Sequence, residues 1–267
     1  LWYSLVWAGY ESEAYRRFSG KFLYHNDRLR AAALDPRFPE VREYLLNIYE
    51  RALIEWDLDG FKFDFLDSFR FDGEDPAIAE GYAGRDYKLL SRAVDRLLTD
   101  AMTRLRAIRP DILIEFRQRY IGPAMRKYGN IFRVGDCPCD VIANRTGIVN
   151  IRRLSGDTAV HSDMLMWNYK EPVEVAALQL LNVLFAVPQI SVRLRDIPES
   201  HRRMLKFYLD FWREFRDVLL DGKLHARQPE CNDTVVSAEK ENRRVSVLYA
   251  AHSALHLAPQ DGGTECI

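Results

Sequence analysis

A carboxylate and an ammonium group occupy alternate positions in the stretch 59–67, which reads DGFKFDFLD. Lys62 and Asp64 are two residues apart, so in a β-strand both side chains lie on one face, roughly 6.5–7 Å apart along the strand. The phenylalanines that alternate with them lie on the opposite face. Burying two charges is costly unless they serve each other or a ligand. The stretch therefore indicates either an ionised carboxylate that acts on a ligand or a structural ion pair, and by itself favours neither.

A second group of charges lies in the stretch 133–140, RVGDCPCD. Arg133 can bind a hydroxylated or anionic ligand through two parallel hydrogen bonds. If Asp136 or Asp140 faced the same space as Asp64, the pair would suit cleavage of a glycosidic bond, in which one carboxylate attacks the anomeric carbon and the other protonates the leaving oxygen. Retaining enzymes hold the two groups about 5–5.5 Å apart and inverting enzymes about 6.5–9.5 Å apart. The alternative interpretation is that Asp136 caps the following helix.

The other polar residues give little support for a zinc site or a serine triad. The cysteines at 137 and 139, with Asp136, Asp140 and His161, fit no standard zinc spacing, so we expect no metal. His161 and Asp163 flank Ser162, and three adjacent residues cannot converge as a serine triad. We interpret His161 and Asp163 as residues that line a site at a strand end.

The composition is that of an ordinary globular protein. The chain has 267 residues, 48% of them apolar, and a formal net charge of −1, which gives no support for a nucleic-acid or membrane-surface partner. No apolar run approaches the length of about 18 residues that a membrane span needs. The sequence begins with an apolar, strand-like run rather than with Met, which indicates a fragment of a longer protein. The compartment stays open, with cytoplasmic and secreted or periplasmic locations both possible.

The pattern along the chain alternates strands with helices. Residues 9–30 show no steady period and are expected to be a long loop. We expect strands at 1–7, 60–65, 111–116, 130–134, 158–161 and 188–192, and helices at 39–56, 86–108, 123–128, 141–154, 172–186 and 198–220. This alternation predicts an α/β fold with a parallel sheet, in which the polar residues collect at the carboxyl ends of the strands. About six β/α units fit an incomplete (β/α)8 barrel or an open doubly wound sheet, and no Gly-x-Gly-x-x-Gly motif supports nucleotide binding.

The character of the sequence changes after Gly222. Short β runs at 223–227, 234–238 and 244–250 follow, with a turn signal between the last two. We therefore predict a partial catalytic barrel over residues 1–222 and the beginning of an antiparallel β-sandwich domain over residues 223–267.

Four motifs, in this order, resemble those of glycoside hydrolase family 36, the melibiase-type α-galactosidases. They are LDPRFPEVR at 34–42, DGFKFDF at 59–65, FRVGD at 132–136 and AVHSD at 159–163. The resemblance covers residues 1–220 and implies a (β/α)8 barrel that this chain enters at its third strand. It also implies that Asp64 is the nucleophile and that Lys62 binds sugar hydroxyls.

The same resemblance implies that Asp136 is the acid/base and that Arg133 binds substrate. The run at 137–139 departs from the family pattern, and a shift in the alignment would make Asp140 the acid/base instead. The residues after the expected strand at 111–116 also differ from the Cys- and Gly-rich loop of many members. Besides Lys62 and Arg133, the expected substrate-binding residues are Trp2, whose ring can stack on a sugar, Arg117, His161 and Asp163.

These expectations combine into one function. The chain resembles a retaining exo-acting α-galactosidase that hydrolyses terminal α-galactosyl residues of oligosaccharides without a cofactor. Lys62 is expected to keep the pKa of Asp64 low, and Asp136 to be protonated when substrate binds. The alternatives are an α-N-acetylgalactosaminidase, galactosyl transfer of the raffinose-synthase kind, and a non-catalytic sugar-binding or inactive relative. Relatives of this kind often form homo-oligomers, so a homo-oligomer is possible here.

Overall fold

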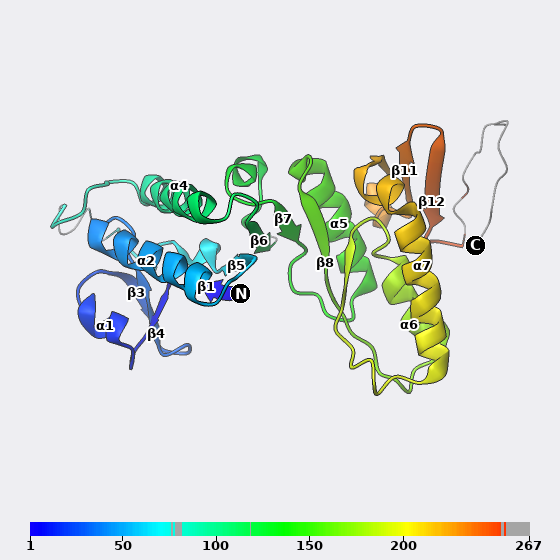
Figure 1. Ribbon diagram of the computed structural model, residues 1–267, viewed down its shortest axis with the longest axis horizontal. Coiled ribbons are helices and arrows are strands. Elements are labelled where there is room, and N and C mark those ends of the chain that lie inside the picture. Colours follow the sequence, from blue (N-terminus) through cyan, green and yellow to red (C-terminus); the bar gives the residue numbers. More distant parts are fainter. Residues whose placement is uncertain (76, 78–81, 118, 252–253, 255–267) are drawn as a thin grey trace. The chain divides into compact units, whose positions relative to one another are not determined.

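The computed structural model describes residues 1–75, 77, 82–117, 119–251 and 254. The chain divides into two compact units, residues 1–133 and 134–267, which are described separately. Figure 1 colours the chain along its sequence and labels many of its helices and strands. The predicted boundary at residue 222 between a barrel and a β domain stays a prediction.

Four parallel strands form the centre of the first unit, in the order β1-β5-β6-β7. The two longest helices of this unit, α2 and α4, pack against each other. The bounds of these strands and helices are β1 Trp2–Ser4, α2 Pro39–Glu55, β5 Gly60–Asp64, α4 Leu90–Ile108, β6 Leu113–Arg117 and β7 Ile131–Arg133. Two 3₁₀ helices, η1 Leu66–Ser68 and η2 Pro123–Lys127, also belong to this unit.

The alternation in the strand β5 divides the sheet into an apolar and a polar face, as the sequence predicts. Phe61 and Phe63 are buried, and their rings stack at 5.3 Å on the side that faces α2, where the Phe63 ring lies 5.0 Å from the buried Tyr49. The side chains of Lys62 and Asp64 lie on the opposite face of β5. Gly60 begins the strand where a Cβ atom would lie 2.0 Å from the carbonyl oxygen of Leu113, so only glycine fits there.

The prediction for residues 1–30 is wrong in two respects. Residues 1–7 form two strands rather than one, because the chain leaves the parallel sheet at the buried pair Leu5 and Val6. Residues 9–30 are not a long loop. They contain α1 Glu13–Arg17, capped by the Ser12 hydroxyl, and the strand β3 Phe22–Asn26, and β2 Trp7–Gly9, β4 Ala31–Leu34 and β3 form an antiparallel sheet in the order β2-β4-β3.

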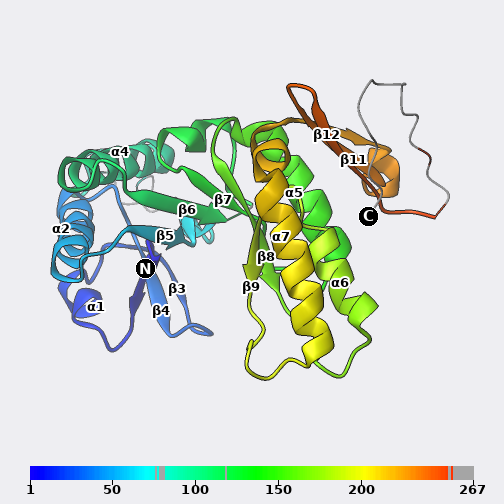
Figure 2. The ribbon, with the colours of Figure 1, turned by 45° about the vertical axis from the view of Figure 1, so that its right-hand side comes forward.

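The second unit contains two parallel strands, β8 and β9, together with three helices and an antiparallel sheet in the order β10-β11-β12. Figure 2 shows α6 and α7 side by side, in keeping with their mutual contacts. The bounds are α5 Val141–Ser155, β8 Ala159–Leu165, α6 Val173–Leu181, β9 Val187–Ile190, α7 Glu199–Asp221, β10 Lys223–Arg227, η3 Pro229–Cys231, β11 Val235–Lys240 and β12 Arg243–Leu248.

The fold class is α/β, with six strands of the parallel kind among the described residues, four in the first unit and two in the second. This confirms the predicted class. The helix expected at 123–128 is the 3₁₀ helix η2, and the helix expected from residue 86 begins at Leu90. Across the described ranges, none of the helices combines the length and the apolar character required to cross a bilayer.

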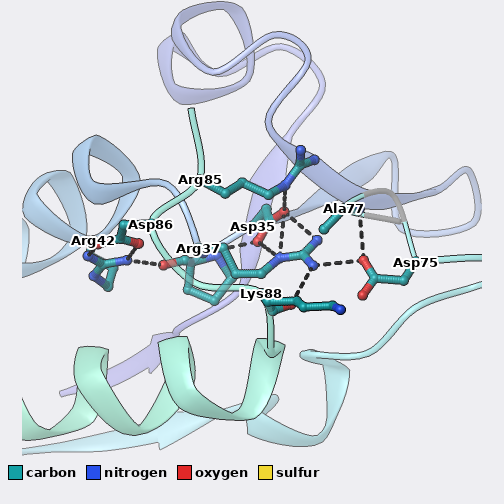
Figure 3. Close-up of polar contacts among 9 residues, drawn as sticks. Asp35, Arg37, Arg42, Asp75, Ala77, Arg85, Asp86 and Lys88 are labelled. Atoms are coloured by element: carbon teal, nitrogen blue, oxygen red, sulfur yellow. Dashed lines mark hydrogen bonds and ion pairs between the residues drawn. The ribbon is translucent and has the colours of Figure 1, made fainter. Parts of the chain in front are cut away.

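A buried ion network fastens the segment after β5 to the beginning of α2 (Figure 3). The guanidinium of Arg37 donates to Asp35, with an Nη2–Oδ2 distance of 2.8 Å, and to Asp75 at 2.7 Å. Arg85 donates to the same Asp35 carboxylate at 2.9 Å. The side chains of Asp35 and Arg37 are both 0% exposed, so their charges are compensated inside the unit. Beside them, the guanidinium of Arg42 pairs with the Asp86 carboxylate.

Candidate active site

Asp64 is the last residue of β5, and its carboxylate accepts hydrogen bonds from three separate segments of the first unit. Arg117, the last residue of β6, donates its Nε to Oδ1 at 2.6 Å. The Tyr120 hydroxyl lies 3.2 Å from the same oxygen. The indole Nε1 of Trp2, in β1, donates to Oδ2 at 3.0 Å. Asp64 and Arg117 thus meet at the carboxyl ends of β5 and β6, where parallel α/β folds carry ligand sites, and Trp2 reaches them from the first position of β1.

The backbone itself turns at this carboxylate. Phe65 has a φ of 64° and a ψ of 25°, the left-handed conformation that non-glycine residues seldom adopt. Its N–H points back and donates to Oδ1 of Asp64 at 2.8 Å. Strained backbone of this kind collects at functional sites, and here it ends the strand directly after the carboxylate.

The surroundings of Asp64 favour its ionised form. Burial alone would raise the pKa of Asp64, but the hydrogen bonds from Trp2 and Arg117 outweigh that effect and the pKa is lowered. Burial likewise opposes the charge of Arg117, and its hydrogen bond to Asp64 raises the Arg117 pKa in return. The carboxylate is thus a stable anion at neutral pH, which a nucleophile requires.

Lys62 does not provide this stabilisation, contrary to our expectation from the sequence. Its Nζ lies 3.8 Å from Oε1 of Glu115, and the Nε of the buried Arg133 lies 3.9 Å from the same oxygen. The parallel register explains the pairing, since Lys62 on β5 lies beside Glu115 on β6. Lys62 is part of a group of charges with Glu115 and Arg133, and Arg117 is the cation that binds Asp64.

Glu115 and Tyr120 are two polar residues of the site that the sequence did not single out. Glu115 shares a face of β6 with Arg117 because the two are separated by one residue, and this period of two is the signal that could have identified it. Tyr120 lies beyond the end of β6, in a segment without a period, so nothing in the pattern pointed to it. Its pKa is raised, because the hydroxyl is buried and lies beside the Asp64 anion.

In the second unit, the loop that carries Asp136 is fastened to β8 by a buried carboxylate. Asp163 is 0% exposed, and its Oδ2 accepts a hydrogen bond from the backbone N–H of Cys137 at 2.6 Å. The N–H of Asp163 donates in turn to the side-chain oxygen of Asn144 in α5 at 3.0 Å. Asp163 therefore holds the backbone next to Asp136, a role that the sequence did not predict for it.

Asp140 has a clear structural role. It is the N-cap of α5, and its Oδ1 accepts hydrogen bonds from the N–H groups of Ile142 at 3.1 Å and Ala143 at 2.9 Å. The capping role that we considered for Asp136 thus belongs to Asp140. His161 lies on β8, half-buried, and its carbonyl oxygen accepts the N–H of Val134 at 3.1 Å.

No group of three or more His, Cys, Asp or Glu side chains suited to a metal ion occurs within the described ranges. Cys139 and Cys231 are free thiols, and Cys266 lies outside the described residues. The charged side chains described around Asp64 are carboxylates, guanidinium groups and the ammonium of Lys62. Carboxylates in such a group suit acid/base and nucleophilic steps.

The structure is similar to solved α-galactosidases of glycoside hydrolase family 36. The α-galactosidase AgaA from Geobacillus stearothermophilus matches 96% of this chain with a TM-score of 0.70 at 16% identity, and this chain covers 37% of AgaA. The α-galactosidase from Lactobacillus brevis matches 89% of the chain with a TM-score of 0.64 at 15% identity, and 33% of that enzyme is covered. The chain therefore spans about a third of the length of these enzymes.

A more distant likeness extends beyond this family. A maltogenic α-amylase, AmyB, from Thermotoga neapolitana matches 92% of the chain with a TM-score of 0.56 at 13% identity, and 62% of AmyB is covered. No family model and no curated protein sequence matches the chain. At these identities the likeness concerns the fold, and the chain has the α/β fold of the catalytic region of the family 36 α-galactosidases.

Proposed function

We propose that the full-length protein is a retaining α-galactosidase that releases terminal galactose from α-galactoside oligosaccharides. The observation that carries the proposal is the Asp64 carboxylate at the end of β5, held ionised by Trp2 and Arg117 in a fold shared with family 36 enzymes. Variants of AgaA have been crystallised in complex with raffinose and with stachyose. By analogy we assign this substrate class to the present protein.

In the proposed mechanism, Asp64 attacks the anomeric carbon while Asp136 protonates the leaving oxygen. Asp136 then removes a proton from water, which attacks the anomeric carbon and releases galactose from the ester. Asp136 is preferred to Asp140 because it is the position that matches the family motif at 132–136, whereas Asp140 caps α5. Lys62, Arg133 and His161 are proposed to bind substrate hydroxyls, and the half-exposed ring of Trp2 is proposed to stack on the sugar.

The decisive test is hydrolysis of p-nitrophenyl α-galactoside by the full-length protein, beside its Asp64→Ala variant. Release of nitrophenol by the parent protein and not by the variant supports both the activity and the nucleophile. Initial formation of α-galactose, followed by NMR, supports retention. Cleavage of an α-N-acetylgalactosaminide alone would keep the mechanism and change the substrate. Activity that survives in Asp64→Ala would overturn the proposal.

A further inference from the structure

The two oxygens of the Asp64 carboxylate have different surroundings. Oδ1 accepts from Arg117 Nε at 2.6 Å and from the Phe65 N–H at 2.8 Å, and the Tyr120 hydroxyl lies 3.2 Å away. Oδ2 accepts from Trp2 Nε1 at 3.0 Å, and within the described ranges that is its one hydrogen bond. Because each carboxylate oxygen offers about two lone-pair directions, Oδ1 is fully engaged and Oδ2 keeps one direction open.

We propose that Oδ2 is the atom of Asp64 that attacks the sugar, and that Arg117 and Tyr120 are positioning residues that hold Oδ1. The proposal rests on the proposed function, because it identifies the reacting atom of that nucleophile. It adds a role for Tyr120, which does not touch the sugar and acts through Asp64.

The donors to Oδ1 are fixed in a way that the donor to Oδ2 is not. The Phe65 N–H is part of the backbone, and its position follows from the left-handed turn after β5. The hydroxyl oxygen of Tyr120 also lies 3.1 Å from the carbonyl oxygen of Phe63 in β5, and this second contact helps to hold the hydroxyl in place. The donor to Oδ2, Trp2, is instead a side chain that is 53% exposed. The carboxylate is thus held more firmly at Oδ1 than at Oδ2.

The reaction balances with these assignments. A lone pair of Oδ2 forms a bond to the anomeric carbon, the bond from that carbon to the leaving oxygen breaks, and the leaving oxygen takes a proton from the acid. Oδ1 becomes the carbonyl oxygen of the resulting ester and can keep its hydrogen bonds from Arg117 and the Phe65 N–H. In the second step water attacks the same carbon, the bond to Oδ2 breaks, and the electron pair returns to the carboxylate.

The direct test is to trap the ester in the full-length protein with a fluorinated galactosyl fluoride, which forms the ester and hydrolyses slowly. A crystal structure of the trapped enzyme then shows which oxygen carries the sugar. The expected result is an ester through the oxygen on the Trp2 side, with the other oxygen still bound by Arg117. An ester through the Arg117-side oxygen overturns this inference alone. Failure to label Asp64 overturns the proposed function and this inference together.

A kinetic test uses Tyr120→Phe, which removes one hydroxyl and keeps the ring. The expected result is a fall in kcat of about tenfold, the order expected for losing a hydrogen bond to a charged group, with KM unchanged within about twofold. The acid limb of kcat/KM should also move to higher pH, because ionised Asp64 has lost a donor. Tyr44→Phe on α2 is the matched control. Superimposable pH profiles for Tyr120→Phe and the parent protein contradict the positioning role.

Discussion

Arg117 binds Asp64 across two neighbouring parallel strands, with its Nε 2.6 Å from Oδ1. Both residues are the last of their strands, β6 and β5, and both side chains are nearly buried, with exposed fractions of 12% and 9%. The carboxylate proposed to attack the sugar is therefore already paired with a cation. That arrangement keeps the carboxylate ionised, so the proposed mechanism should be most sensitive to substitutions in this pair.

Replacing Arg117 by Met should shift the pH dependence of activity. Burial raises the pKa of Asp64, and Arg117 is one of the donors that outweigh this effect. Without it the pKa rises, so the acid limb of kcat/KM should move to higher pH. The measurement is kcat/KM for p-nitrophenyl α-galactoside between about pH 3 and pH 8, a range that extends beyond the ordinary pKa values of Asp and His. Arg51→Met, at an exposed position of α2, is the control, and an unchanged acid limb in Arg117→Met would contradict the argument.

Replacing Glu115 by Gln should weaken substrate binding. The carboxylate lies between Lys62 and Arg133, at 3.8 Å and 3.9 Å, and its loss leaves two neighbouring cations less well compensated. If these cations bind sugar hydroxyls, KM should rise by about tenfold, with a smaller change in kcat. Steady-state kinetics with raffinose as substrate measure the two constants. A change confined to kcat would instead place Glu115 in the chemical step.

Asp136 and Asp140 should be distinguishable by their variants. Asp140→Ala removes the cap of α5 and should lower the free energy of unfolding by about 0.5–2 kcal/mol, whereas Asp140→Ser keeps a capping oxygen and should cost less. Asp136→Ala should lose activity most on oligosaccharides with poor leaving groups, because an acid matters least when the leaving group is good. Urea unfolding and kinetics on both substrate types measure these effects. Loss of activity in Asp140→Ser with normal stability would make Asp140 the acid/base.

Replacing Arg37 by Met should destabilise the protein severely. The Asp35 carboxylate would remain buried with Arg85 as its remaining cation in the part of the network described here, and removing one partner of a buried pair typically costs about 3–5 kcal/mol. Arg37→Lys should recover little of this stability, since an ammonium cannot reproduce the forked contact with Asp35 and Asp75. Urea denaturation of the three proteins provides the comparison. Equal midpoints for Arg37→Lys and the parent protein would show that charge alone is sufficient.

The contact between Asp75 and Arg37 should make stability depend on pH. Burial raises the pKa of Asp75, but its hydrogen bond to Arg37 outweighs this and the folded-state pKa is lowered. The contribution is therefore fully present above the unfolded value, about 3.9, and is lost as the pH falls through the lower folded value. Asp75→Asn should reduce the loss of stability between about pH 5 and pH 2. Urea denaturation of the parent protein and Asp75→Asn at both ends of this pH range tests the prediction. It would be refuted if both proteins lost the same free energy of unfolding over the range.

The elements around Asp64 could be predicted because the local pattern and the tertiary fold agree there. Phe61 and Phe63 are both buried on the α2 side of β5, as their spacing requires, and α2 begins at Pro39, the first-turn position that suits proline. The parallel strands and the main helices follow the same logic of period and length.

The antiparallel sheet in residues 7–34 could not be predicted, because its strands are short and their partners are fixed by tertiary contacts. The strand β4, Ala31–Leu34, is buried at all four positions and so has no alternation to detect. The switch at Leu5 and Val6 joins two sheets within the run at 1–7, which is apolar apart from Ser4 and resembles a single strand. Pattern alone does not reveal where such a run changes its partner.

The partner of the Asp64 carboxylate could not be predicted either. Spacing in β5 suggested Lys62, because the two side chains share a face of one strand. The register instead sets Lys62 beside Glu115 and leaves Asp64 to Arg117 at the end of β6. Register between strands depends on the packing of both, so a carboxylate's neighbours across a sheet are not readable from its own strand.

The buried network of Asp35, Arg37 and Arg85 also has a consequence for the order of folding. Arg85 reaches Asp35 across 50 residues of chain, and β5 with Asp64 lies within that interval. Asp35 and Arg37 are two residues apart and can pair locally, but the contact between Arg85 and Asp35 forms only after this loop has closed, when β4, β5 and α2 are in place. Amide hydrogens around Asp64 should therefore become protected late, together with those near Arg85, and the proposed nucleophile would be assembled by the same step that completes this part of the molecule.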